Sequence, residues 1–301
     1  MKIGQGVSRC LSSLCLLLGY SRQAYYQHQR CREKEALQSE LLLQQVFRIR
    51  ERQKRIGTRK LFFMLTDFLQ QHRISIGRDA FFDLLRERNL LVRKRKSRKP
   101  RTTFSCFWMH RYPNLTKDFI PTGPNQFWVS DITYIAIGED FGYLSLITDA
   151  YSHKVVGFYL CEDLSAKGCI LALKMALKNN PERKNLIHHS DRGLQYYSVA
   201  YVKLLEPSIR ISMSENSDPL ENAIAERMNG ILKDELLEKY FETFAQAQRA
   251  VAVAISIYNH ERPHSSVDLL TPAMAHLQSG ELKKRWKNYY KPKLKQVELQ
   301  A

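Results

Sequence analysis

The sequence contains no Cys-x-x-Cys pair, which argues against a zinc-bound module. Its six cysteines are scattered, at positions 10, 15, 31, 106, 161 and 169, and unpaired thiols suit a reducing cytosol. Long apolar runs are also absent. The stretch from Leu14 to Leu18 is far too short to cross a membrane, and it lacks the small-residue cleavage site of a signal peptide. We therefore expect a cytoplasmic protein with no membrane partner.

Acidic residues are scarce in the first part of the chain. Of the 301 residues, 47 are lysine or arginine and 30 are aspartate or glutamate, which gives a net charge of +17. Residues 1–124 hold 26 basic and 9 acidic residues, whereas residues 125–301 hold 21 of each. This asymmetry indicates a polyanionic partner for the N-terminal part. The length allows two domains with a sizeable core.

Residues 7–30 have the pattern of two short helices around a turn. The first helix is indicated by apolar residues with helical spacing, and Gly19 is expected to end it. Ser21 can cap the second helix. The second helix is basic and rich in tyrosine and glutamine, so Arg22 and Gln23 are candidate major-groove contacts of a helix-turn-helix. A plain helical hairpin fits the pattern equally well.

Residues 37–70 are predicted to be helical, amphipathic and rich in arginine on the polar side. The residues Gly57-Thr58-Arg59-Lys60 are expected to start a new helix, which then runs from Leu61 to Gln70. A further helix near Asp79–Leu85 completes a second helix-turn-helix candidate.

A block of basic residues follows these helices. Seven of the nine residues from Arg93 to Arg101 are basic and none is apolar. Such a block is usually a solvated linker or a phosphate-binding arm, and between two domains of a DNA-binding protein it can be both. The linker is expected to end near Pro124. The candidate phosphate contacts in the block are Arg93, Lys94, Arg95 and Lys96.

The rest of the chain has the alternating pattern of an α/β domain. Three strands joined by short turns predict an antiparallel meander, after which helices and strands alternate. The strands are expected at 126–137, 142–150, 153–161, 185–189 and 209–213, and the helices at 165–178, 198–206, around Glu226 and at 243–259.

Three acidic residues are candidates for a shared site. Asp131 interrupts an aromatic and β-branched strand, where an unpaired carboxylate is costly unless a metal or an opposite charge relieves it. Asp191 follows a short apolar strand, so its carboxylate is expected at the edge of the sheet. Carboxylates that converge on an open position suit Mg²⁺. The candidate catalytic and metal-binding set is Asp131, Asp191 and Glu226.

The helix that carries Glu226 has one polar and one apolar face. At 100° per residue, the side chains of Asn222, Glu226, Asn229 and Lys233 fall within about 60° of one line. Glu221 points about 140° away from Glu226, so only one of the two glutamates can face the aspartates.

The spacing and the local motifs resemble one protein family. The acids Asp191 and Glu226 are separated by 34 residues. Asp131 stands in Trp-x-x-Asp-Ile-Thr, and Asp191 stands in His-Ser-Asp-Arg-Gly-x-Gln-Tyr. Together these motifs resemble the DDE transposase/integrase superfamily and, more narrowly, the second-frame product of insertion sequences of the IS-three family. Lys233 matches the basic residue that these enzymes carry on the same helix face, and Tyr258–His264 with Thr271-Pro272 matches the end of their catalytic domain. A departure is Glu221-Asn222-Ala223, where many relatives have Asp-Asn-Ala.

The resemblance implies an α/β fold: a ribonuclease H-like mixed-sheet catalytic domain preceded by an all-helical helix-turn-helix DNA-binding region. It implies a transposase that cleaves and joins insertion-element ends by phosphoryl transfer with two Mg²⁺ ions, which Mn²⁺ can replace. The alternative is a catalytically silent DNA-binding regulator derived from a transposase. The expected domains are a helix-turn-helix-like segment at 1–36, a helical DNA-binding domain at 37–100, a basic linker at 101–124, the catalytic core at 125–280 and a basic tail at 281–301.

The expected partners also come from the resemblance. They are DNA, as element terminal inverted repeats and target, and further copies of the chain in the DNA complex. The chain starts without the leucine-zipper frame that the family has upstream, so an upstream-frame partner is expected too. The localisation expected is the bacterial cytoplasm, at the nucleoid. Within the core, the residues expected to contact DNA are Lys233, Arg192 and Asn222.

Some residues near the motifs allow a simpler interpretation. His188 and His189 precede Asp191 but are expected to be packed or hydrogen-bonded rather than metal ligands. Trp128 is expected in the core. Arg262 and His264 could line the DNA channel or pair locally, and the sequence leaves both possibilities open.

Overall fold

The computed structural model describes residues 4–93, 112–116, 119–183, 185–206, 208–215 and 223–285, with side chains from residue 11 onward. Two compact units are present, one of Met1–Arg52 with Ile56–Val92 and one of Gln53–Arg55 with Arg93–Ala301. The domain limits proposed from the sequence remain predictions. Some predicted features lie outside the described residues, namely most of the linker, the end of the basic tail, Lys94, Arg95, Lys96, Glu221 and Asn222.

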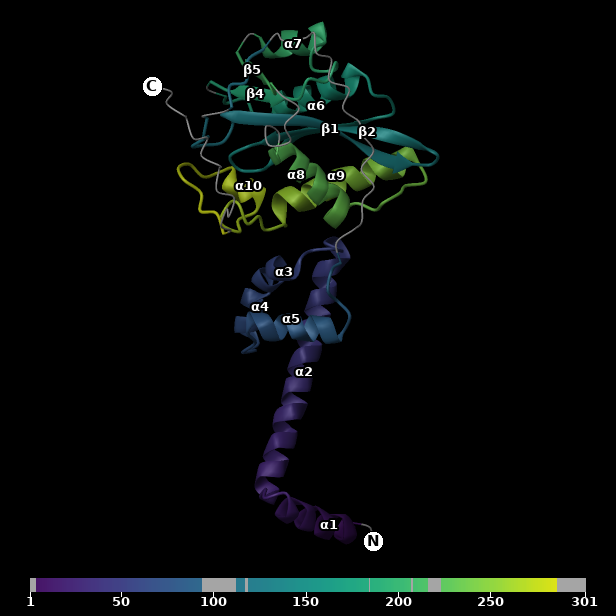
Figure 1. The fold of residues 1–301 in the computed structure, drawn as a ribbon, viewed down its shortest axis with the longest axis vertical. Helices are drawn as coiled ribbons and strands as arrows, with labels where there is room; N and C mark the ends of the chain where they lie inside the picture. Colours follow the sequence, from purple (N-terminus) through teal and green to yellow (C-terminus); the bar gives the residue numbers. More distant parts are fainter. Residues whose placement is uncertain are drawn as a thin grey trace, which may run out of the picture. The chain divides into compact units, whose positions relative to one another are not determined.

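The described part of the first unit is helical, as the sequence predicts (Figure 1). Its core is formed by apolar side chains that three of the helices contribute, among them Val46, Leu61 and Phe81. The helices are α1 (Gly4–Leu17), α2 (Arg22–Arg52), α3 (Thr58–Met64), α4 (Thr66–Gln71) and α5 (Arg78–Glu87).

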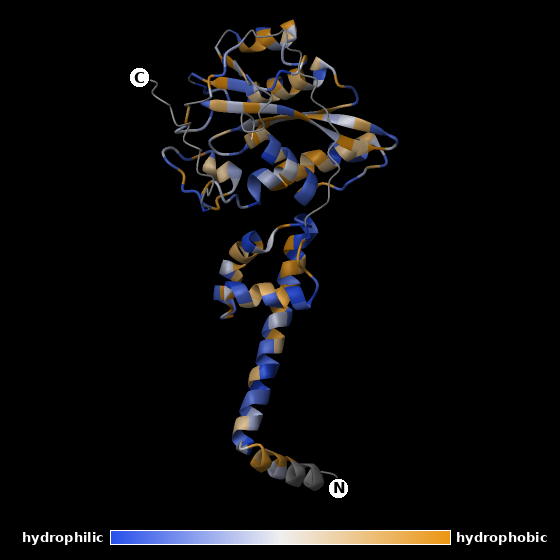
Figure 2. Cartoon of the chain, in the orientation of Figure 1, coloured by the Kyte–Doolittle hydropathy of each residue, from blue (hydrophilic) through white to orange (hydrophobic). Residues whose placement is uncertain are grey.

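The helix α2 differs from the prediction. Two separate helices were expected between residues 22 and 52, but one helix of 31 residues spans them, including the expected domain limit at 36/37. The segment contains neither glycine nor proline and is rich in strong helix formers, so nothing in it breaks the helix. Its start is as predicted, because the Ser21 hydroxyl accepts a hydrogen bond from the amide of Ala24 at 3.0 Å. The middle of this helix is mostly hydrophilic, in contrast to α1 (Figure 2).

The predicted helix from Leu61 to Gln70 also divides. The helix α3 ends at Met64, Leu65 caps it, and α4 begins at Thr66. The Thr66 hydroxyl donates to the carbonyl of Phe63 at 2.8 Å, a local bond that competes with the regular helical pattern.

The second unit is built on a five-stranded mixed sheet with the order β3-β2-β1-β4-β5. The first three strands form an antiparallel meander, and β4 and β5 add to it in parallel. This strand order confirms the predicted ribonuclease H-like fold. The strands are β1 (Phe127–Ile137), β2 (Asp140–Asp149), β3 (Val155–Cys161), β4 (Ile187–Ser190) and β5 (Arg210–Met213).

Helices cover both faces of this sheet. Figure 1 shows α6 (Ala166–Asn179) and α7 (Val199–Leu205) on one face, and α8 (Ala223–Ile231) and α9 (Phe244–His260) on the other. The turn of π-helix η2 (Leu232–Leu236) continues α8, and the short α10 (Pro272–Ala275) follows α9.

Each face has its own apolar core. Trp128 and Ile147 pack with α6 and α7, while Leu144 and Leu146 pack with α8 and α9. Trp128 is fully buried, as expected. The helix α6 lies so close to β3 that a Cβ atom added at Gly157 would stand 2.3 Å from the carbonyl oxygen of Ala172. In the described part of the chain, no helix is both long and apolar enough to cross a membrane.

Candidate active site

Two of the predicted acids are brought together by the register of the sheet. The strands β1 and β4 are parallel neighbours, and Ser130 pairs with Ser190. Asp131 follows Ser130 and Asp191 follows Ser190 in the sequence. Because the two strands run in the same direction, the two aspartates lie side by side just beyond this pair. The sequence predicted both acids, but only the register makes them neighbours.

The carboxylate of Asp131 is held from two sides. The side-chain amide of Asn229, on α8, donates to its Oδ2 atom at 2.6 Å, and the amide of Ile132 donates to its Oδ1 atom at 2.9 Å. The other polar atom of the Asn229 side chain, Oδ1, is buried and has no hydrogen-bond partner among the described residues. From the sequence, Asn229 was predicted only to share a helix face with Glu226, and its contact with Asp131 was missed. The three-residue spacing from Glu226 was the available signal.

The carboxylate of Asp191 is held by the loop that follows it. The amide of Gly193 donates to its Oδ1 atom at 3.1 Å. A Cβ atom at Gly193 would stand only 3.1 Å from that oxygen and 3.0 Å from Oε1 of Gln195. This close approach explains why the loop has a glycine here.

The charges at the site repel one another. Burial and the neighbouring charges of Asp191 and Glu226 raise the pKa of Asp131 to about 8, although part of the side chain stays accessible. Burial also raises the pKa of Asp191. A bound cation would relieve this cost, and the carboxylate oxygens suit a hard divalent ion such as Mg²⁺.

Glu226 lies in the first turn of α8 and is exposed. Its charge reaches Asp131, but within the described ranges no three acidic, histidine or cysteine side chains lie close enough to hold a metal ion. The structure thus assembles Asp131 and Asp191 closely and places Glu226 at the margin of the pair.

Lys233, on η2, lies close enough to Asp131 for their charges to interact. Its Nζ atom is 3.9 Å from the centre of the Tyr134 ring, a cation–π contact. Burial lowers the pKa of Lys233 to about 8, although the charges of Asp131 and Asp234 act in the opposite direction. Tyr134 was not singled out in the sequence, because nothing there shows that it lies under Lys233.

Arg192 connects the ends of β4 and β5. Its Nε atom donates to the carbonyl of Ser214 at 2.6 Å, and its Nη2 atom is buried without a hydrogen-bond partner in the described part of the chain. The other described candidates for DNA contacts, Arg22, Gln23 and Arg93, are exposed.

The two histidines before Asp191 are hydrogen-bonded in the core. The Nε2 atom of His188 lies 2.8 Å from the Ser130 hydroxyl and 2.9 Å from the Tyr201 hydroxyl. Burial lowers its pKa to about 3, so the ring is neutral. The Nδ1 atom of His189 lies 2.9 Å from the Ser212 hydroxyl. The expectation that both residues are packed is therefore confirmed.

The segment Tyr258–His264 pairs locally. Arg262 is 1% exposed and donates two hydrogen bonds to Glu235, at 2.8 and 2.9 Å. The side chain of Asn259 bonds both the amide and the carbonyl of Val155, each at 3.0 Å. The His264 ring stacks on His153 with 4.5 Å between the centres. Of the two possibilities left open by the sequence, the contacts favour local pairing for Arg262 and His264.

Comparison with known proteins agrees with this architecture. Two families described as "Integrase core domain" match residues 121–219 and 207–272. The insertion element IS600 uncharacterized 31 kDa protein of Shigella sonnei is 36% identical over 268 residues, which cover 86% of this chain and 96% of that protein. The putative transposase of element IS986/IS6110 from Mycobacterium tuberculosis is 31% identical over 152 residues, 48% of this chain and 55% of that protein.

Solved structures also match the core. The catalytic core domain of HTLV-2 integrase, in complex with magnesium, is 20% identical with a TM-score of 0.43, and the match covers 52% of this chain and 99% of that chain. The simian T-cell lymphotropic virus intasome matches at 18% identity and a TM-score of 0.46 over 79% of this chain and 78% of that one. The extended similarity to the IS600 protein and the two integrase core matches show that the chain belongs to the insertion-sequence transposases of the DDE integrase/transposase superfamily.

Proposed function

We propose that the protein cleaves the ends of its insertion element and joins them to target DNA by phosphoryl transfer at Asp131, Asp191 and Glu226. The observation that carries the proposal is the pair of partly buried aspartates at the ends of paired parallel segments of β1 and β4, each with a raised pKa. A structural ion pair would contain a matching cation, whereas two like charges favour a bound metal.

The chain's own residues prepare the site. Asn229 and the amide of Ile132 fix the orientation of the Asp131 carboxylate, and the amide of Gly193 fixes that of Asp191. Lys233 stands beside them, where it can contact a DNA phosphate. Glu226, whose charge reaches Asp131, completes the set. Two Mg²⁺ ions, or Mn²⁺, would activate the attacking oxygen and stabilise the leaving oxygen.

The basic N-terminal part would hold the DNA. Residues 1–124 carry the whole net charge of +17, which supports phosphate contacts by the helical region and by the block from Arg93 to Arg101. Two element ends must meet during transposition, so we propose a homo-oligomer on DNA, with an upstream-frame protein as a further partner.

The direct test is strand transfer by the purified full chain with element-end DNA, target DNA and Mg²⁺. We expect nicked and joined products that depend on the metal and contain no protein covalently attached to DNA, because the attacking group is water or a 3′-hydroxyl. Protein recovered in covalent linkage to DNA from a quenched reaction would contradict the mechanism. Tight end binding with no product under any divalent metal would favour the silent regulator instead.

The role of the basic block can be tested separately. Neutralising Arg93, Lys94, Arg95 and Lys96 to glutamine should reduce the slope of log affinity against log salt by up to about 3.6, since each phosphate contact contributes about 0.9. Replacing the basic residues Lys174 and Lys178 of α6 serves as the control and should change the slope little.

A further inference from the structure

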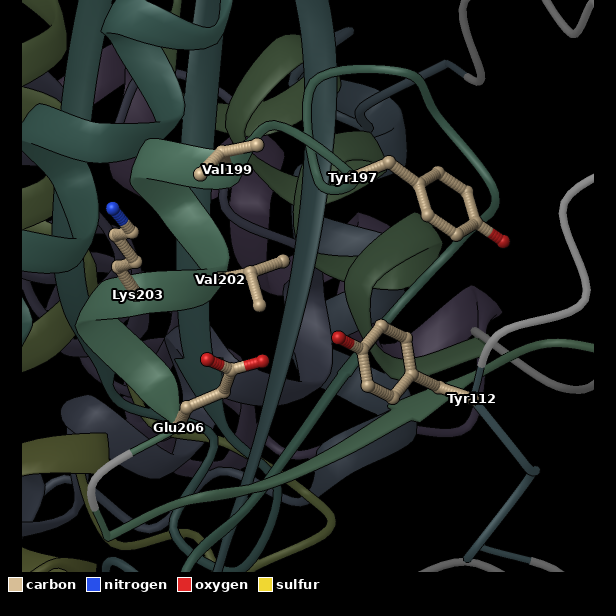
Figure 3. A pocket seen from close by; sticks show the side chains of 6 residues that line it. All are labelled: Tyr112, Tyr197, Val199, Val202, Lys203 and Glu206. Carbon is tan, nitrogen blue, oxygen red and sulfur yellow. The ribbon is translucent and has the colours of Figure 1, made fainter.

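A pocket of about 170 Å³ opens beside α7, on the flank of the sheet formed by β5. Its volume is below the roughly 300 Å³ of pockets for drug-sized ligands, so it suits one flat ring system. Figure 3 shows the six side chains that line it: Tyr112, Tyr197, Val199, Val202, Lys203 and Glu206.

Two aromatic rings form one side of the pocket, and both are partly exposed. The position of Tyr112 is fixed by the residues after it, because the carbonyl of Pro113 accepts from the amide of Met213 at 3.4 Å and the amide of Leu115 donates to the Ser212 hydroxyl at 2.9 Å. Tyr197 is fixed by a turn in which its amide donates to the carbonyl of Leu194 at 3.2 Å.

The opposite side of the pocket is the surface of α7. Val199 and Val202 provide apolar contact, and Glu206 provides a carboxylate. In Figure 3 the Glu206 carboxylate points into the space between α7 and Tyr112, while the ammonium group of Lys203 points away from it. A flat, apolar ring with an amino group at its edge would match these surfaces, because its faces could stack and its amino group could donate to Glu206.

The pocket lies near Asp191. Tyr197 follows Asp191 by six residues, and the charges of Arg192 and Asp191 both reach its hydroxyl group. Arg192 lies between the pocket and Asp191 in sequence, and it has a buried donor, Nη2, with no hydrogen-bond partner in the described residues. A DNA strand whose phosphate lies at Asp191 can therefore present a neighbouring base to the pocket.

We propose that this pocket receives one unpaired nucleobase of the DNA strand held at Asp131 and Asp191, stacked against Tyr112 and Tyr197. The inference rests on the proposed function. Stacking on aromatic side chains is the general means of holding unpaired bases, and a glutamate accepts from the exocyclic amino group of cytosine in the same way as from other amino-bearing bases. Taking a base out of a duplex costs a few kcal/mol, which is least at a nicked or frayed end such as a transposase creates.

The test is a coupling experiment on the full-length protein. Strand transfer and end binding are measured for the wild type and for the Tyr112→Ala/Tyr197→Ala variant, on intact element ends and on ends with a single abasic site at each successive position near the cleavage point. On intact ends the variant should lose about 5- to 140-fold, the range expected for one stacked base. At one abasic position the difference between variant and wild type should disappear, because the base that the rings hold is no longer there.

Two controls sharpen the result. Tyr240→Ala removes a ring that is 53% exposed elsewhere on the core, and it should leave both measurements unchanged at every position. Glu206→Gln should reduce the preference for an amino-bearing base over thymine at the coupled position without changing transfer on the matching abasic end.

A loss in the tyrosine variant that stays the same at every abasic position would overturn the proposal. So would a large fall in the melting temperature of the DNA-free variant with equal losses on all DNAs, since the rings would then serve packing of the protein. If wild type itself joined no ends, the proposed function would fail first. If the wild type joined ends but the effect of the tyrosine substitutions were the same at every abasic position, only the base-pocket proposal would be contradicted.

Discussion

The aspartate site and the Tyr258–His264 segment are both rich in charged and polar groups, yet they are arranged in opposite ways. At Arg262, the buried guanidinium has a carboxylate partner, and the amide of Asn259 satisfies a strand end. At Asp131 and Asp191, burial and the neighbouring like charges raise the pKa of Asp131 to about 8. The attraction within a charge pair offsets part of the cost of burying it, whereas repelling charges add to that cost.

This contrast distinguishes the motifs around Asp131 and Asp191 from the Tyr258–His264 motif. Both belong to the resemblance to the transposase family, and neither the spacing nor the residue types distinguish chemistry from architecture. The contacts do distinguish them. We therefore expect substitutions at the aspartate site to change activity more than stability, and substitutions in the Tyr258–His264 segment to do the reverse.

The largest effect is expected for Glu226→Gln. The substitution removes the third carboxylate, so strand transfer should fall by at least about 1000-fold, as it does when an essential member of a catalytic group is lost. End binding and melting temperature should stay close to those of the wild type, because the exposed side chain packs against nothing essential.

Glu221→Gln is the matched control, since Glu221 stands five residues earlier in the sequence, a spacing for which an ideal helix would give directions about 140° apart. It should keep measurable activity. An active Glu226→Gln beside an inactive Glu221→Gln would overturn the assignment.

The next effect is expected for Arg262→Met and concerns stability. Removing one partner of a buried ion pair leaves the other uncompensated, and because the side chain of Glu235 is 21% exposed the cost should be at the lower end of the usual range, about 3 kcal/mol. Urea unfolding would measure it, and transfer by the folded fraction should stay within a few-fold. Arg249→Met, at an exposed arginine of α9, should cost less than about 0.5 kcal/mol. Equal costs for the two variants would mean that Arg262 is not a structural residue.

A smaller effect concerns the pH dependence of stability without metal. The pKa of Asp131 is about 8 in the folded state and about 3.9 for an unfolded aspartate, so the folded state binds the extra proton between these values. Stability should therefore fall as pH rises from about 4 to about 8. Asp131→Asn should remove this contribution, so its melting temperature relative to wild type, in EDTA, should rise across the window.

Asp163→Asn is the control of opposite sign. Hydrogen bonds from Ser165 and Cys161 lower the pKa of Asp163, so its carboxylate stabilises the fold once ionised, and the variant should gain nothing as pH rises. A melting-temperature difference for Asp131→Asn that did not depend on pH would show that the pKa of Asp131 is not raised in the folded protein without metal.

Much of the core could be predicted because its signals are local. The strand β1 was expected at 126–137 and is found at Phe127–Ile137, and the helix expected at 165–178 is found as α6, Ala166–Asn179. The alternation of apolar and polar residues, the turn residues and the capping residues each involve only a few neighbouring positions, so the sequence alone reveals them. The order of these elements was then enough for the ribonuclease H-like topology.

The remaining features depend on residues that are distant in sequence. The pairing of Ser130 with Ser190 sets Asp131 beside Asp191, and the contact of Asn229 with Asp131 requires α8 to pack on β1. The partner of Arg262 lies 27 residues earlier, on a π-helical turn that no helical periodicity of 3.6 predicts. Such contacts follow from packing, which the sequence pattern does not specify.

The smallest effect is expected at Lys233. Its side chain is partly buried, and its charge interacts with Asp131 of the aspartate site. Its pKa of about 8 means that its charge is present at pH 6.5 and largely lost at pH 9.5. If Lys233 contacts a DNA phosphate, Lys233→Met should reduce the salt slope of end binding by about 0.9 at the lower pH and by almost nothing at the higher one. Lys233→Arg should keep the slope at both pH values, because arginine stays charged.

Lys239→Met, at an exposed lysine of the next segment, serves as the control and should change the slope equally at both pH values. A Lys233→Met effect of the same size at both pH values would show that the lysine acts through packing on Tyr134 rather than through its charge.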